Sequence, residues 1–173
     1  LPSLGWMKQG RGRTAVAGLI NNEERVIQVA SDIELPIARF TGAHEIGHAV
    51  LHQGLTGLHR DRPLTAATGH RNRVEYEADK FAAYFLMPKK LVKAQFMLRF
   101  TMPFKLDEQT SFALFGESLS VSYQRLPNLR HTARVLASAT RFNGCNFVSL
   151  SEYFNLSVEA VAIRLEELKL IDY

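Results

Sequence analysis

Two histidines and a glutamate in the spacing H-E-x-x-H, at His44, Glu45 and His48, are the residues of this sequence best suited to chemistry. In a helix, residues four apart lie on one face with Cβ atoms about 5–6 Å apart, so both imidazoles can reach one metal ion. Glu45 is rotated about 100° from His44 and can take a proton from a water molecule at that metal. Because a five-residue pattern also occurs by chance, a third ligand must decide whether this is a metal site.

A second segment with acidic residues, Glu75-Tyr76-Glu77-Ala78-Asp79, supplies candidates for that ligand. If Glu75 binds the metal, Asp79 lies one helical turn further along the same face and can accept the N–H of a ligand histidine. Glu77 points about 200° away from Glu75, which predicts a side chain facing water, although it stays the alternative ligand. Two histidines and a glutamate favour zinc, one ion per chain, with manganese or iron as other occupants.

Other histidines and polar residues fit the site less well. His52 lies eight residues after His44, about 12 Å along a helix axis, so it is predicted to cap or pack and not to share the metal. A donor for the oxyanion of the transition state is expected near the metal. Residue type alone leaves four candidates for this donor, which are His70, Tyr84, Arg73 and Tyr123.

The surrounding pattern predicts an α+β fold, with a small antiparallel sheet packed on a mostly helical core. Two β-branched runs, 14–20 and 25–30, form a predicted hairpin, and residues 36–53 form a helix that starts at Pro36 and stops before Gly54. Further helices are predicted at 73–87, 89–100, 129–140, 148–154 and 157–168, with a loop at 54–72 and a weak strand alternation within 105–122. The last two helices have the outline of a helix-turn-helix. We expect a core domain at 1–103 and a mostly helical region, suited to docking a partner, at 104–173.

Composition excludes several classes of protein. The chain has 173 residues, of which 46% are hydrophobic and 22% charged, as in ordinary globular proteins and unlike disordered ones. No apolar run approaches the roughly 18 residues of a membrane-spanning helix, so no membrane partner is expected. The single cysteine, Cys145, cannot form an internal disulfide, which favours a reducing, cytoplasmic setting.

The net charge of +4 comes from one segment of the chain. No acidic residue lies between Glu117 and Glu152, where four arginines occur: Arg125, Arg130, Arg134 and Arg141. This segment is either a solvated helix face or a docking surface for an acidic partner, and Arg130 and Arg134, four residues apart, are the candidates for partner contact. Helix 157–168 carries three glutamates and one arginine, so direct nucleic-acid binding is disfavoured.

Taken together, the two motifs resemble those of the ImmA/IrrE metallopeptidases, within the glutamate-zincin group. The first matching segment is Arg39-Phe40-Thr41-Gly42-Ala43-His44-Glu45-Ile46-Gly47-His48, followed by Leu51-His52. The second is Glu75-Tyr76-Glu77-Ala78-Asp79-Lys80-Phe81-Ala82-Ala83, followed by Leu86-Met87-Pro88. The resemblance covers residues 13–92, and more loosely 150–171, while residues 93–149 match nothing.

This resemblance implies a zincin-like core in which His44, His48 and Glu75 bind zinc, Glu45 is the catalytic base and Asp79 supports a ligand. It also implies a cytoplasmic endopeptidase that cuts a helix-turn-helix transcriptional repressor and thereby releases stress-response or mobile-element genes.

Two other functions compete with this interpretation. One is a metal-containing regulator that binds DNA or docks a protein without proteolytic turnover. The other is a structural zinc protein, in which Cys145 could occupy the fourth coordination position. Only three ligands are evident in the sequence, and an open position favours catalysis.

Overall fold

The computed structural model describes residues 6–9, 12–15, 17–21, 24–52, 58–61 and 73–173. By its internal contacts the chain divides into two compact units, Leu1–Leu86 and Met87–Tyr173. The functional boundary expected after residue 103 stays a prediction, because compactness alone defines these units. Within the described ranges, no helix combines the length and the apolar character needed to cross a bilayer.

The first unit contains two small antiparallel sheets. Strands β1 (Trp6–Gln9) and β2 (Gly12–Ala15) form an antiparallel pair, and a three-stranded sheet has the order β4-β3-β5. In this sheet β3 (Gly18–Asn21) pairs with both β4 (Val26–Val29) and β5 (Leu58–Asp61). The antiparallel β3–β4 pair confirms the predicted pairing, but the first predicted run, 14–20, is divided between β2, which ends at Ala15, and β3, which begins at Gly18. Strand β5 interrupts the segment predicted to be a loop, most of which lies outside the described residues.

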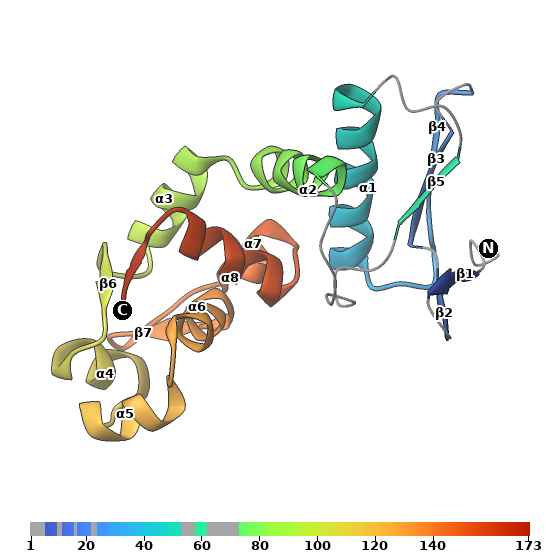
Figure 1. The fold of residues 1–173 in the computed structure, drawn as a ribbon. Coiled ribbons are helices and arrows are strands. Elements are labelled where there is room, and N and C mark those ends of the chain that lie inside the picture. The colour runs from blue at the N-terminus through green and yellow to red at the C-terminus, as the bar shows by residue number, and fades with distance from the viewer. Residues whose placement is uncertain (1–5, 10–11, 16, 22–23, 53–57, 62–72) are drawn as a thin grey trace. The chain divides into compact units, whose positions relative to one another are not determined.

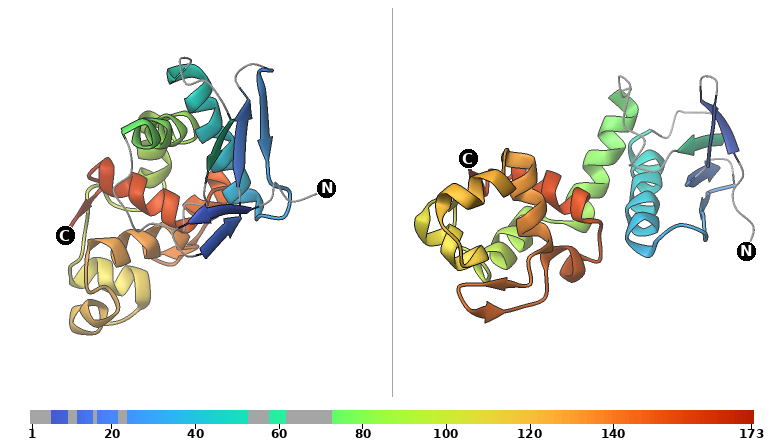
Figure 2. Two further views of the ribbon diagram at one scale, coloured as in Figure 1. Left: turned by 45° about the vertical axis from the view of Figure 1, so that its right-hand side comes forward. Right: turned by 90° about the horizontal axis from the view of Figure 1, so that it is seen from below.

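Helix α1 (Leu35–Leu51) lies between the three-stranded sheet and helix α2 (Arg73–Leu86), as Figures 1 and 2 show. Both helices were predicted, the first from Pro36 in its opening turn. The two helices approach closely at Gly47, where an added Cβ would lie 3.1 Å from Phe81 Cβ and 3.2 Å from Ala78 Cα. Small residues on both sides of this crossing therefore bring the two motif-bearing helices together.

The second unit is mainly helical, and its helix α6 packs against α8 (Figure 1). Its helices are α3 (Lys89–Met97), α4 (Glu108–Phe115), α5 (Leu119–Arg125), α6 (Leu129–Ser138), α7 (Leu150–Phe154) and α8 (Val158–Glu167). Two short strand pairs accompany them, parallel β6 (Phe104–Lys105) with β9 (Ile171–Asp172) and antiparallel β7 (Arg141–Phe142) with β8 (Cys145–Asn146). The α+β class predicted from the sequence is confirmed, as are helices α3, α6, α7 and α8.

The weak strand alternation expected within 105–122 is wrong, because this segment forms α4 and α5. Asp107 and Thr110 form a reciprocal capping box at the start of α4, and Gly116, with φ 71°, ends that helix in the left-handed conformation. The alternation was not a core pattern, since Phe112 is 70% exposed. Helix-end signals therefore decide the local structure here.

A buried arginine, Arg164, connects α8 to the start of the second unit. Its Nε donates to the Met87 carbonyl oxygen at 3.1 Å, and its Nη1 donates to Glu167 Oε2 at 3.0 Å. These bonds satisfy a charged group that is 5% exposed.

Candidate metal centre

Helices α1 and α2 bring together the three candidate ligand atoms that the sequence singled out, and their binding of a metal stays a prediction. His44 Nε2 and His48 Nε2 are 2.9 Å apart, and Glu75 Oε2 lies 3.5 Å from the first and 3.7 Å from the second. Ligand atoms about 2.0–2.1 Å from one tetrahedral zinc ion would be about 3.4 Å from each other. The three side chains therefore have the spacing that a single ion requires.

The chemistry of these donors also fits a divalent cation. Two ring nitrogens and a carboxylate oxygen this close together repel one another unless a cation or a proton lies among them. His44 and His48 are 8% and 2% exposed, so bulk water screens that repulsion weakly. The group contains no cysteine, and Cys145 is exposed on β8.

His44 is held from its other ring nitrogen by a carboxylate of α2. Its Nδ1 lies 3.0 Å from Asp79 Oδ1. Because a carboxylate accepts hydrogen bonds, His44 Nδ1 carries the proton and its Nε2 is left with a lone pair for a metal. This is the contact predicted for Asp79, whose support of a metal ligand stays a prediction.

His48 has a corresponding arrangement that the sequence analysis missed. Its Nδ1 lies 3.1 Å from His52 Nδ1, and His52 Nε2 lies 3.1 Å from Glu77 Oε2. Arg73 Nε in turn donates to Glu77 Oε1 at 2.7 Å. The hydrogen bonds from Arg73, and secondly from His52, lower the pKa of Glu77 below its usual value. Glu77 was expected to face water without a role, yet both of its carboxylate oxygens are engaged.

His52 is also the C-cap of α1, because its backbone N–H donates to the His48 carbonyl oxygen at 2.9 Å. The capping role was expected, but the side-chain contact with His48 was not. The four-residue spacing could have revealed this contact, since residues i and i+4 meet on one helix face. Nothing in the sequence pairs His52 with Glu77, which lies on another helix.

Glu45, the predicted base, is completely buried on the side of α1 that faces β3. An added Cβ at Gly18 of β3 would overlap Glu45 Oε1 and would lie 2.7 Å from Thr41 Cγ2. The strand can cover this carboxylate only because residue 18 has no side chain. Gly18 was not among the predicted site residues, because no local signal in the sequence marks it.

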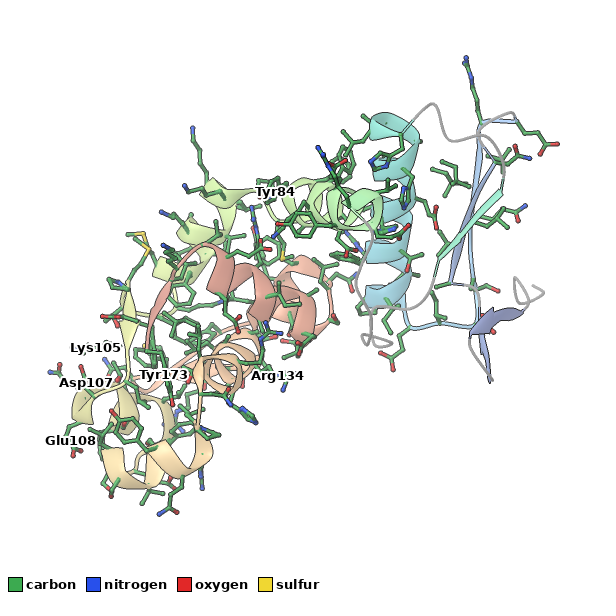
Figure 3. The ribbon with its side chains drawn as sticks, viewed as in Figure 1. Tyr84, Lys105, Asp107, Glu108, Arg134 and Tyr173 are labelled. Carbon is green, nitrogen blue, oxygen red and sulfur yellow. The ribbon has the colours of Figure 1, made fainter. Side chains whose placement is uncertain are left out.

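The candidate oxyanion donors are not brought to the ligand atoms by any described contact. His70 lies outside the described residues, and Tyr123 belongs to the second unit. Tyr84, labelled on α2 in Figure 3, is 55% exposed and follows Glu75 by nine residues, about 13 Å along the helix axis. Arg73 is paired with Glu77. The identity of the donor stays a prediction.

Arg130 and Arg134 of α6 form ion pairs with α8. Arg130 bonds Glu166, with Nη2 to Oε2 at 2.9 Å, and also Glu159, while Arg134 Nε donates to Glu159 Oε2 at 2.6 Å (Figure 3 labels Arg134). The hydrogen bond from Arg134, and after it the one from Arg130, lowers the pKa of Glu159 below its usual value. The positive charge of α6 and the negative charge of α8 thus compensate each other, and contact of these arginines with a partner stays a prediction.

Comparison with known proteins identifies the family. The family model for peptidase M78, described as the IrrE N-terminal-like domain, matches residues 7–126, well over half of the chain. The chain belongs to the IrrE N-terminal-like peptidase family. The family consists of metallopeptidases, so the resemblance recognised from the two motifs is confirmed. No curated protein and no solved structure matches the chain.

The match also corrects the extent of the IrrE N-terminal-like resemblance. Residues 93–126 were expected to match nothing, but the family model continues through α3, α4 and α5 to residue 126. Helices α6, α7 and α8 follow the matched region. The helix-turn-helix-like pair was only loosely compared with the family, and the match does not include it.

Proposed function

We propose that this IrrE N-terminal-like peptidase is a zinc-dependent endopeptidase that hydrolyses a peptide bond in a protein substrate. The convergence of His44 Nε2, His48 Nε2 and Glu75 Oε2 carries the proposal. These atoms would hold one zinc ion per chain, and Asp79 would orient His44. Zinc suits a mixed nitrogen and oxygen set, although manganese accepts the same ligands.

Zinc bound by these residues would supply Lewis acidity, which polarises a peptide carbonyl and makes water a better nucleophile near neutral pH. Glu45 would accept the proton of the attacking water as the base and would deliver it to the leaving amine nitrogen. Its burial against Gly18 holds the carboxylate in one place and keeps bulk water away from it. The proposal therefore uses Glu45 for proton transfer, and His44, His48 and Glu75 for binding.

A substrate chain could bind in an extended form along the three-stranded sheet. The order β4-β3-β5 makes β4 and β5 the outer strands among the described residues of this sheet. An extended peptide that adds to an outer strand gains main-chain hydrogen bonds independently of its side chains. Selection of the substrate would then depend on other surfaces, and we assign this role to residues 104–173.

The finer part of the proposal concerns the substrate and its setting. We propose a helix-turn-helix transcriptional repressor as substrate, cut in the cytoplasm, so that stress-response or mobile-element genes are released. Support comes from the resemblance of the two motifs to the ImmA/IrrE metallopeptidases and from membership of this peptidase family.

Metal content tests the binding part of the proposal without a substrate. We expect mass spectrometry to find about one zinc per chain in the purified parent and in Glu34→Ala, an exposed carboxylate at the start of α1. Glu75→Ala should lose the metal. A parent that binds no zinc after incubation with it would contradict the proposal and would favour a regulator without turnover.

Replacement of the base tests catalysis separately. Glu45→Gln removes the proton acceptor while keeping nearly the same volume, so zinc should stay bound and cleavage should fall by at least about 100-fold. Candidate substrates are proteins that accumulate uncut in cells with Glu45→Gln and are shortened in cells with the parent. Full cleavage by Glu45→Gln would refute the assigned role of Glu45.

A further inference from the structure

A chain of three side chains leads away from His48 on the side opposite the ligand atoms. It runs from His48 Nδ1 to His52 Nδ1 at 3.1 Å, from His52 Nε2 to Glu77 Oε2 at 3.1 Å, and from Glu77 Oε1 to Arg73 Nε at 2.7 Å. His52 is largely buried, with 9% of its side chain exposed, whereas Arg73 lies at the surface. The chain thus connects the buried His48 with a surface ion pair.

For a neutral His52, the donors and acceptors at the Arg73 end set the direction of every hydrogen bond in this chain. Arg73 can only donate and the carboxylate of Glu77 accepts, so His52 Nε2 must donate to Glu77. A neutral imidazole with a proton on Nε2 has a lone pair on Nδ1, and His52 Nδ1 is therefore an acceptor. The proton between the two histidines then belongs to His48 Nδ1. As a result, His48 Nε2 carries a lone pair and faces His44 and Glu75.

We propose that His52 and Glu77 are positioning residues that hold His48 in the tautomer and ring orientation needed to bind the metal. Arg73 anchors Glu77 by the i,i+4 ion pair at the start of α2. The inference rests on the proposed zinc site and assigns two residues that act on the metal only through His48. Asp79 has the same relation to His44, so α2 orients both histidines of α1 through separate carboxylates.

Zinc affinity tests this inference, and a chelator competition measures it. Loss of a group that orients a metal ligand typically weakens metal binding about 10- to 100-fold. We expect this loss for His52→Leu, which keeps the packing volume but removes both ring nitrogens, and for Glu77→Leu. His52→Gln should regain part of the affinity, because its amide has both an acceptor and a donor. His131→Leu, at an exposed histidine of α6, is the matched control and should bind zinc like the parent.

Two results separate the failure of this inference from the failure of the zinc proposal. A parent without zinc affinity contradicts the proposed function itself. A parent that binds zinc, together with a folded His52→Leu variant of equal affinity, overturns the positioning role. Thermal unfolding of the metal-free proteins identifies variants that are simply unfolded.

Nitrogen NMR of the zinc-loaded parent tests the same inference without any substitution at His52. The ¹⁵N shifts of imidazoles distinguish protonated, unprotonated and metal-bound ring nitrogens. We expect a proton on His48 Nδ1, a proton on His52 Nε2 and an unprotonated His52 Nδ1. A proton on His52 Nδ1 would reverse the bond to His48 and would overturn the proposal.

Discussion

Gly18→Ala adds a single methyl group to β3, directly over the carboxylate of Glu45. The new Cβ would overlap Glu45 Oε1 and would lie 2.7 Å from Thr41 Cγ2, and both of these side chains are buried. The φ angle of Gly18 is not in the left-handed region, so alanine causes no backbone strain there. The variant therefore changes the contacts of two buried side chains, Glu45 and Thr41, and the end of the longer Glu45 side chain is the part most able to move.

The two consequences of this displacement differ in size. Overpacking of a core typically costs about 1–3 kcal/mol, and we expect about 1 kcal/mol here because the atom displaced is the end of a flexible side chain. A catalytic group misplaced by about 1 Å can lose about 100-fold in rate, which corresponds to about 2.7 kcal/mol of transition-state stabilisation. Gly18→Ala should therefore remain folded and bind zinc, but lose about 99% of its activity.

The assay combines urea unfolding, zinc content and hydrolysis of a mixture of internally quenched peptides. Gly42→Ala is the matched control, since its Cβ would meet only Val29 Cγ2, at an ordinary 3.6 Å. Alanine at this position inside α1 should raise the free energy of unfolding by up to about 1 kcal/mol and leave hydrolysis unchanged. If Gly18→Ala hydrolyses the peptides as fast as the parent, the placement of Glu45 against β3, or its role as base, is refuted.

Three further predictions concern contacts inside the first or the second unit. Asp79→Ala should weaken zinc binding about 10- to 100-fold in a chelator competition, because His44 loses its orienting carboxylate; parent-like affinity would contradict this. Gly47→Ala forces α1 and α2 apart by a few tenths of an ångström, so zinc affinity should fall although alanine has the higher helix propensity. An affinity equal to that of the parent in the same competition would disprove the tight crossing. The pKa of Glu159 is lower in the folded than in the unfolded chain, so its ion pairs stabilise the fold above about pH 4.5 and are lost as the pH falls through the lower folded value. Arg134→Ala should lower the free energy of unfolding by about 0.5 kcal/mol at pH 7 and by less at pH 3, measured by urea titration at both pH values. An equal loss at the two pH values would exclude this ion pair as the cause.

The sequence was sufficient to predict which residues share one face of a helix, and that the H-E-x-x-H motif and the Glu75–Asp79 segment would meet. The four-residue steps from His44 to His48 and from Glu75 to Asp79 follow from helical periodicity, and the structure brings the three ligand atoms together. The contact of His52 with Glu77, in contrast, required the structure. Glu77 meets His52 because α1 and α2 cross closely at Gly47, and no pattern within either helix specifies that crossing.

The arginine segment shows a related limit of sequence analysis. Arg130 and Arg134 were recognised as one helix face, but their carboxylate partners are 25 to 36 residues away on α8. Excess positive charge along the sequence therefore does not become an equal excess at the surface. The short strand β5 was missed for the same reason, because pairing with β3 defines it and its four residues carry little pattern of their own.

All of the groups proposed for metal binding, proton transfer and ligand orientation belong to residues 44–79, within the first compact unit. The buried bond from Arg164 to the Met87 carbonyl oxygen belongs wholly to the second unit and fixes α8 to the residue that follows α2. In evolutionary terms, this separation makes the chain modular. With substrate selection assigned to residues 104–173, as proposed above, substitutions in α4 to α8 would change recognition while every proposed chemical group keeps its identity. Selection would then act on specificity and on hydrolysis independently.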